Sequence, residues 1–133
     1  MPTKTPLKIE GGKLKQFSSS DFIAPANKTG VVTLIDAATI LVDATLGDTF
    51  IVTLGGNRTL GNPTGAVNGQ KLTFRIRQDE IGSRTLSFDT KYRLGTDLTA
   101  ITLTTTAGKT DYIGVIYHLT DDKFDVVAFM KGY

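Results

Sequence analysis

The stretch QKLTFRIRQ, residues 70–78, decides the fold class. Leu72, Phe74 and Ile76 alternate along it with threonine and arginine residues. Successive side chains of a β-strand point to opposite faces, so a period of two is typical of a half-buried strand. The pattern therefore predicts a strand whose three apolar residues face a hydrophobic core.

The same alternation predicts strands on both sides of this stretch. In DTFIVTL, residues 48–54, it places Phe50, Val52 and Leu54 on one face. Further strands are expected at residues 30–36, 38–45, 84–88, 100–105, 110–119 and 124–131, with a short strand between glycine-rich loops at residues 55–69. The last two expected strands flank a short polar turn and should form a hairpin. About nine strands separated by short turns, without any helical spacing, favour an all-β fold, an antiparallel β-sandwich or jelly-roll-like module.

The composition changes near residue 30 and divides the chain into two parts. Pro2, Pro6 and Pro25, the pair Gly11-Gly12 and a run of serines precede this point. Such residues interrupt regular structure, and a frayed terminus is one explanation for them. However, spaced apolar residues also occur there, and a simple linker would not need them. We therefore expect residues 1–29 to form an extended N-terminal arm that orders against a surface, and residues 30–133 to form one β-sandwich module.

The charge distribution of the arm predicts that it binds a partner. Residues 1–22 contain four lysines and two acidic residues, which accounts for the whole chain's net charge of +2. Basic residues would steer the arm toward an acidic surface, where its apolar residues could be buried. The candidate partner-binding residues are Leu7, Ile9, Lys13, Leu14, Lys15, Phe17 and Phe22.

Length and composition exclude several classes of protein. The 133 residues, 40% of them hydrophobic, are typical of a single globular domain. The chain contains no cysteine, which excludes disulfides and thiolate zinc sites. The first residues lack the apolar region of a secretory signal, and no apolar run approaches the ~20 residues that span a bilayer. We expect synthesis in the cytoplasm, no membrane insertion and, at this small net charge, no nucleic-acid partner.

Candidate catalytic residues do not form a recognised constellation in the sequence. His118 is the single histidine, so it cannot belong to a histidine-rich metal site, and we expect no cofactor. None of the serines lies in the sharp-turn motif of a serine nucleophile. The adjacent carboxylates Asp121 and Asp122 are expected in a solvated turn. We therefore predict a protein that is not an enzyme.

Four arginines could in principle form a nucleic-acid-binding patch. They are Arg75, Arg77, Arg84 and Arg93. Aromatic residues are not interleaved with them as in a single-strand-binding platform, and acidic residues lie close by in the sequence. Ion pairs, within the chain or between subunits, are therefore the preferred interpretation.

Three consecutive segments resemble a β-module of tailed-bacteriophage virion proteins. In chain order they are GGNRTLGNPTGAVNGQKLTFRIRQD, GSRTLSFDTKYRLGTD and TDYIGVIYHLTDDKFDVVAFMKGY, and the stretch that contains them, from Gly55 to the end, is about 80 of the 133 residues. Members of that group are displayed β-modules of tail fibres and other particle surface proteins, often homotrimeric and without catalytic residues. The resemblance implies a structural protein at the virion surface that is synthesised in the host cytoplasm.

Two binding functions follow from the resemblance. The first is a homotrimeric capsid decoration (cement) or short head-fibre protein, whose arm binds the major capsid protein or another virion protein. The absence of a long shaft before the module favours it. The alternative is a receptor-binding module of a tail fibre or baseplate, in which loops at residues 61–69 and 95–98 contact host-surface glycans. Tyr92, near Asp89 and Asp97, is the aromatic–carboxylate grouping that such a site would use. A glycan depolymerase is a third hypothesis, for which the sequence offers no catalytic constellation.

Overall fold

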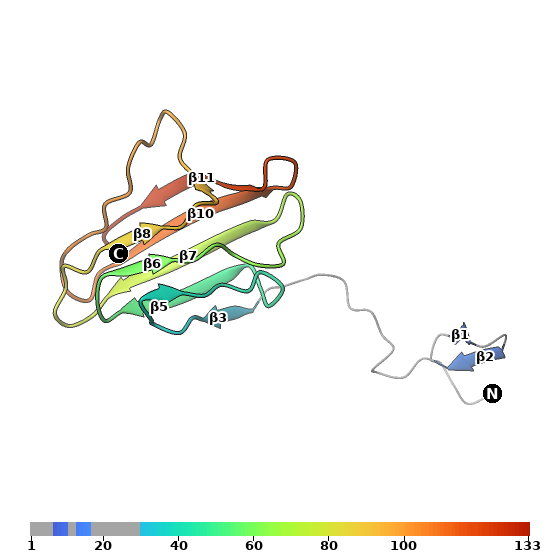
Figure 1. Cartoon of the computed structure of the whole chain (residues 1–133). Helices are drawn as coiled ribbons and strands as arrows, with labels where there is room; N and C mark the ends of the chain where they lie inside the picture. Colours follow the sequence, from blue (N-terminus) through green and yellow to red (C-terminus); the bar gives the residue numbers. More distant parts are fainter. Residues whose placement is uncertain (1–6, 11–12, 17–29) are drawn as a thin grey trace.

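The computed structural model describes residues 7–10, 13–16 and 30–133, and all regular structure in these residues is β. The predicted all-β class is confirmed, and no helix occurs in the described part of the chain. Residues 30–133 contain nine strands (Figure 1). They are β3 (Val31–Thr33), β4 (Thr39–Ile40), β5 (Thr49–Leu54), β6 (Arg58–Leu60), β7 (Lys71–Gln78), β8 (Leu86–Phe88), β9 (Tyr92–Arg93), β10 (Thr110–His118) and β11 (Lys123–Met130).

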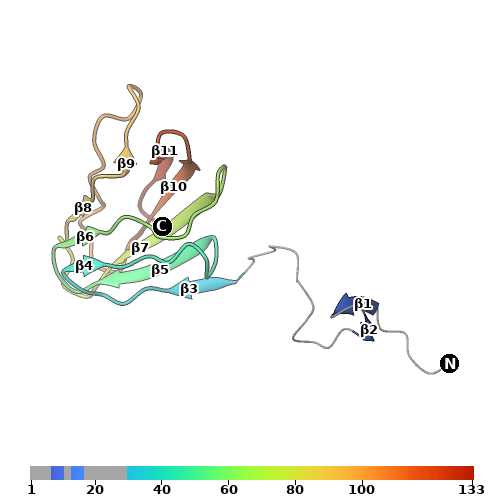
Figure 2. The same ribbon diagram turned by 45° about the vertical axis from the view of Figure 1, so that its right-hand side comes forward.

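The strands from β3 to β8 alternate between two sheets. One sheet has six strands in the order β3-β5-β7-β10-β11-β9, and the other has three in the order β4-β6-β8. Neighbours within each series from β3 to β8 are parallel. The chain therefore winds through three coils, each of which adds one strand to each sheet (Figure 2). We name residues 31–46, which contain β3 and β4, the first coil.

This parallel winding corrects the prediction of an antiparallel module. Side-chain alternation shows which face of a strand is buried, but it does not show which strand lies beside it. Because each connection crosses to the other sheet before the chain returns, successive strands of one sheet run in the same direction. Antiparallel pairing is confined, within residues 30–133, to β10 with its neighbours β7 and β11. The predicted C-terminal hairpin is confirmed, with His118 opposite Lys123 and Tyr112 opposite Met130.

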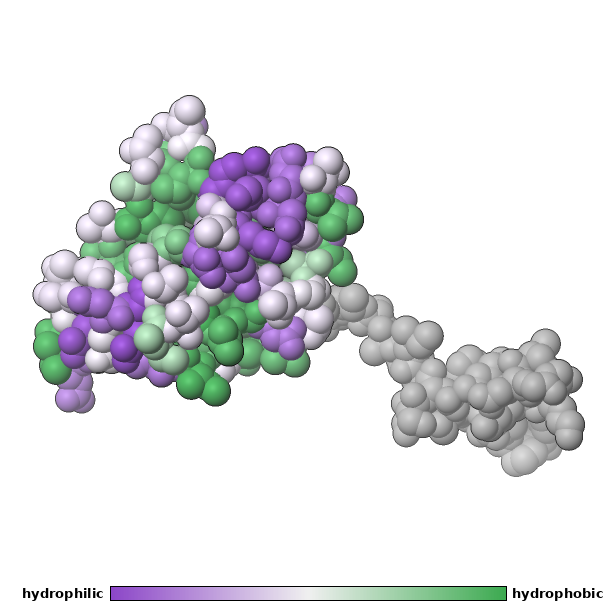
Figure 3. Space-filling view, in the orientation of Figure 1, coloured by the Kyte–Doolittle hydropathy of each residue, from purple (hydrophilic) through white to green (hydrophobic). Residues whose placement is uncertain are grey.

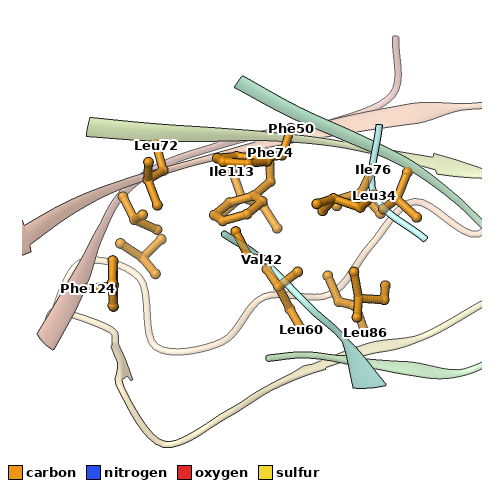
Figure 4. Packing of buried hydrophobic residues seen from close by; sticks show 14 of the residues in the cluster. Leu34, Val42, Phe50, Leu60, Leu72, Phe74, Ile76, Leu86, Ile113 and Phe124 are labelled. Carbon is orange, nitrogen blue, oxygen red and sulfur yellow. The ribbon is translucent and has the colours of Figure 1, made fainter. Parts of the chain in front are cut away.

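Parallel register stacks the apolar side chains of successive coils. Val32 lies opposite Phe50, and Phe50 lies opposite Phe74. In the other sheet Leu60 lies between Ile40 and Phe88 in the same way. In Figure 4, Phe50 and Phe74 lie on one side of the core and Leu60 lies on the other. The buried faces predicted for β5 and β7 are confirmed, since the following residues are all buried: Phe50, Val52, Leu54, Leu72, Phe74 and Ile76.

The short elements differ from the predictions. The expected strand at residues 100–105 is a loop, although Leu103 within it is buried. This loop is held by Asp111, whose carboxylate accepts hydrogen bonds from the Thr104 N–H (2.6 Å) and hydroxyl (2.8 Å). Strand β9, which was not predicted, pairs in parallel with Phe124 and Asp125 of β11.

Within the predicted arm, the described residues form a β-hairpin. Strand β1 (Leu7–Glu10) pairs antiparallel with β2 (Lys13–Gln16). Five of the seven candidate partner-binding residues lie on these two strands, whereas Phe17 and Phe22 lie outside the described residues.

Candidate interaction surfaces

The register of the β1–β2 hairpin separates its apolar and basic residues. Ile9 lies opposite Leu14, and Lys8 lies opposite Lys15. Opposite residues of an antiparallel pair share a face, and successive pairs alternate between the two faces. Leu7, Ile9 and Leu14 therefore occupy one set of alternate register positions, whereas Lys13 and Lys15 occupy the other. This separation is suited to a contact that combines apolar burial with charge attraction.

A groove with an apolar lining runs along the first coil. Its volume is about 470 Å³, and its walls include Val32, Leu34 and Val42 at the edge of the core. The rim carries large aliphatic side chains that are open to solvent: Ile35 is 82% exposed, Leu41 79% and Leu46 63%. Figure 3 shows hydrophobic residues along the lower edge of the module, where β3 lies in Figure 1. Apolar patches of this kind often mark binding surfaces.

The groove was not found from the sequence because its residues also fit a strand pattern. Residues 30–36 and 38–45 were expected to form strands along their whole length. Within them, only Val31–Thr33 (β3) and Thr39–Ile40 (β4) are strands. The remaining residues connect the two sheets, and Ile35 and Leu41 point to solvent instead of a core. Their apolar character is the signal that could have indicated an interface.

A second hollow, of about 430 Å³, is polar. The loop at residues 61–69 forms one side of it, and Lys91, Tyr117 and Asp122 form the other. Asp122 accepts a hydrogen bond from the Tyr117 hydroxyl (2.8 Å) and pairs with Lys91 (2.8 Å). The Lys91 ammonium, followed by the Tyr117 hydroxyl, lowers the pKa of Asp122, and Asp122 in turn raises the pKa of Lys91.

The backbone fixes the shape of this polar hollow. Asp122 has a φ of 51°, in the left-handed region that non-glycine residues rarely adopt. Asn62 lies on the opposite wall, where its side-chain oxygen Oδ1 accepts a hydrogen bond from the Lys91 backbone N–H (2.8 Å). Its amide group donates to the Thr90 hydroxyl (3.1 Å). The hollow thus presents an ammonium, a carboxylate and an amide, groups that can hydrogen-bond to a polar ligand.

The loop at residues 95–98 lines a third hollow, beside β11. Tyr92, expected as an exposed aromatic near this loop, is instead packed against Phe74, Phe88 and Phe124. Its hydroxyl donates a hydrogen bond to the Gly61 carbonyl (2.9 Å), and burial raises its pKa. The expectation of a sugar-stacking surface at Tyr92 is therefore wrong.

His118 lies at the end of β10 and forms a weak contact with one carboxylate. Its Nδ1 is 3.5 Å from Oδ2 of Asp121, and both side chains are about half exposed. Asp121 also pairs with Arg93 (3.0 Å). Among the described residues, no group of three or more histidine, aspartate or glutamate side chains is placed to hold a metal ion. The described residues also contain no helix of the length and hydrophobicity needed to cross a membrane.

Two of the four arginines considered above form ion pairs within the chain, as expected. Arg84 pairs with Asp79 (2.9 Å), and Arg93 pairs with Asp125 (2.6 Å). Arg75 instead donates to the Tyr112 hydroxyl (3.1 Å) and lies over the Tyr112 ring.

Comparisons of the chain with protein-family models, curated proteins and solved structures found no match. The function is therefore inferred from the surfaces described above.

Proposed function

We propose that the protein is a non-enzymatic structural protein of a bacteriophage virion. In this proposal it is a homotrimeric capsid decoration (cement) or short head-fibre protein, anchored to the particle surface by its N-terminal arm. The observation that carries the proposal is the β1–β2 hairpin, which separates apolar from basic residues ahead of a module with its own core. The resemblance of residues 55–133 to virion β-modules supports the same function.

The arm would bind by burying its apolar face. Leu7, Ile9 and Leu14 would contact an apolar groove on the major capsid protein or another virion protein, while Lys13 and Lys15 remain near acidic groups at its edge. Burial of aliphatic side chains contributes roughly 25 cal/mol per Å² of apolar surface removed from water. A two-stranded hairpin also has two outer edges, either of which could extend a sheet of the partner.

Within this proposal, the module is a β-sandwich that faces solvent. The core between the two sheets supports that architecture, and the coiled connections favour it over a jelly roll.

Binding to purified particles tests the proposal. We expect the full chain to co-sediment with particles, and the variant Leu7→Asp/Ile9→Asp/Leu14→Asp to lose at least tenfold in affinity. The matched control is Thr96→Asp/Thr99→Asp/Thr102→Asp, which adds the same charge to exposed loop positions of the module. Equal binding by both variants would exclude the hairpin as the anchor. Immunogold label absent from otherwise complete particles would exclude the virion assignment.

The polar hollow supports a second candidate, the receptor-binding module. The predicted glycan-contacting loop at residues 61–69 forms one wall of it, with Asn62 facing Lys91 and Asp122. In this case, Asn62→Ala and Lys91→Ala should weaken binding to a host polysaccharide without changing the melting temperature by more than a few degrees. Label restricted to the tail would favour this candidate over the capsid proposal.

A further inference from the structure

Both sheets end at the first coil, so two strand edges lie on the same side of the module. β3 is the outer strand of the six-stranded sheet, and β4 is the outer strand of the three-stranded sheet. In the described part of the chain, β3 pairs with β5 and β4 with β6, and neither has a strand on its other side. Unpaired strand edges are sites where another chain can add, and proteins usually protect them.

The apolar groove lies between these two edges. Stacked coils bury one another's apolar faces, so a terminal coil leaves one face without a neighbour unless something covers it. Here Val31, Ile35, Leu41 and Leu46 remain 59–82% exposed on that coil. We name this surface, formed by the groove and these four residues, the first-coil face.

The acidic groups at and beside the first-coil face form hydrogen bonds within the chain. Asp36 forms two hydrogen bonds with the Arg58 guanidinium (2.8 and 2.9 Å) and one with the Gly55 N–H (3.1 Å). Arg58 is therefore the main cause of the lowered pKa of Asp36. Asp43, the one ionisable residue in the groove lining, accepts hydrogen bonds from the Thr45 N–H and hydroxyl.

We propose that the first-coil face is the surface through which copies of this chain contact one another. Around a three-fold axis the copies of each residue lie close together, so a strongly charged surface would repel its own copies, whereas an apolar surface with one ionisable residue in its groove would not. The same reasoning disfavours a strongly charged partner. Each neighbouring copy also supplies strand edges, β3 and β4, that can meet those of the first copy. The inference rests on the homotrimer proposed above and identifies the surface that would form it.

The oligomeric state of the full-length chain, measured by native mass spectrometry and light scattering, tests this contact. We expect the wild type to be a trimer and Ile35→Glu/Leu41→Glu to be a monomer. Ile81→Glu/Leu119→Glu is the matched control, because Ile81 is 76% exposed and Leu119 59% exposed at positions outside the first-coil face. The control should remain trimeric.

Cross-linking provides a second measurement that introduces no charge. The chain has no cysteine, so a single introduced thiol reports only on its own position. With a short bifunctional maleimide, Leu46→Cys should give covalent dimers, whereas Ile81→Cys should remain a single chain.

Different results would overturn the first-coil face and the proposed homotrimer. A trimer that persists in Ile35→Glu/Leu41→Glu, with no cross-linking of Leu46→Cys, would overturn the first-coil face and leave the homotrimer intact. A wild type that is monomeric at all concentrations would overturn both, although particle binding by the arm would be unaffected. A wild-type dimer that dissociates in the same variant would support the first-coil face and exclude the trimer.

Discussion

The phenyl rings of Phe50 and Phe74 stack across the parallel pair β5–β7, with centroids 5.7 Å apart and ring planes inclined at 25°. Both side chains are fully buried. The contact joins the second coil to the third, so its loss should affect the stability of the whole module.

Substitution of Phe74 tests this stack. Phe74→Asp places an unpaired carboxylate in the core and should lower the free energy of unfolding by more than about 4 kcal/mol. Phe74→Leu keeps the site apolar and should lower it by only about 1 kcal/mol. Arg75→Ala, on the opposite face of the same strand, should cost about 1 kcal/mol or less through lost contacts with Tyr112. Urea unfolding measures all three, and wild-type stability of Phe74→Asp would contradict the strand register.

Asp111 links the loop at residues 100–105 to the C-terminus. It is 2% exposed and accepts hydrogen bonds from the Thr104 N–H and hydroxyl and from the Gly132 N–H. Asp111→Ala leaves these donors without their acceptor and should lower the free energy of unfolding by roughly 2–4 kcal/mol. Thr104→Val removes only the hydroxyl bond and should cost about 1 kcal/mol. Faster amide exchange at Gly132 in Asp111→Ala, but not in Thr104→Val, would show that part of the lost stability comes from the hydrogen bond between Asp111 and Gly132.

The ion pair between Asp79 and Arg84 should make stability depend on pH. The Arg84 guanidinium, followed by the Gly82 and Ile81 N–H groups, lowers the pKa of Asp79 from 3.8 to about 2. Because the pKa is lower in the folded state, this stabilisation is fully present above pH 3.8 and is lost as the pH falls through 2. The melting temperature of Asp79→Asn should therefore be below that of the wild type at neutral pH and converge with it near pH 2. The control Glu80→Gln, at the exposed neighbouring residue, should melt like the wild type at neutral pH.

Two glycines with similar backbone angles should respond differently to substitution. Gly82 has a φ of 77° and Gly69 a φ of 81°. A Cβ on Gly82 would lie 2.5 Å from the Thr105 carbonyl oxygen, whereas a Cβ on Gly69 would meet no atom within 4 Å. Gly69→Ala should cost about 1 kcal/mol from backbone strain, and Gly82→Ala should exceed it by at least about 1 kcal/mol because of the clash. Equal losses of unfolding free energy in the two variants would mean that the loop of Gly82 moves away from the loop of Thr105 at little cost.

The sequence predicted the strands whose side chains alternate over several residues. These strands are β5, β7, β10 and β11, each six or more residues long. The alternation is clearest in β5 and β7. Their buried faces follow from local periodicity, and the turn between β10 and β11 indicated their pairing. The parallel pairing of the coils depends on contacts between distant residues, such as Thr49 with Thr73, so no local pattern could indicate it.

The interaction surfaces were predicted less completely. The hairpin residues Ile9 and Leu14 were named as partner-binding, but their opposite register depends on a pairing that the sequence pattern did not specify. The loop at residues 61–69 was expected to contact a ligand, and it does line a hollow, but Lys91 and Asp122 reach that hollow only through folding. Tyr92 was misassigned because an aromatic near carboxylates looks the same in sequence whether it is buried or exposed.

The winding of the chain makes the two ends of the module different: further coils can be added before the first coil, but not between β8 and the hairpin β10–β11. An additional coil of about the length of residues 31–46, inserted before Val31, would extend both sheets by one strand without touching the antiparallel hairpin β10–β11. An insertion after β8 would instead separate β7 from β10, and so break the sheet that closes the core. Related proteins of different length would therefore be expected to differ in the number of coils at the N-terminal side while keeping the C-terminal hairpin unchanged.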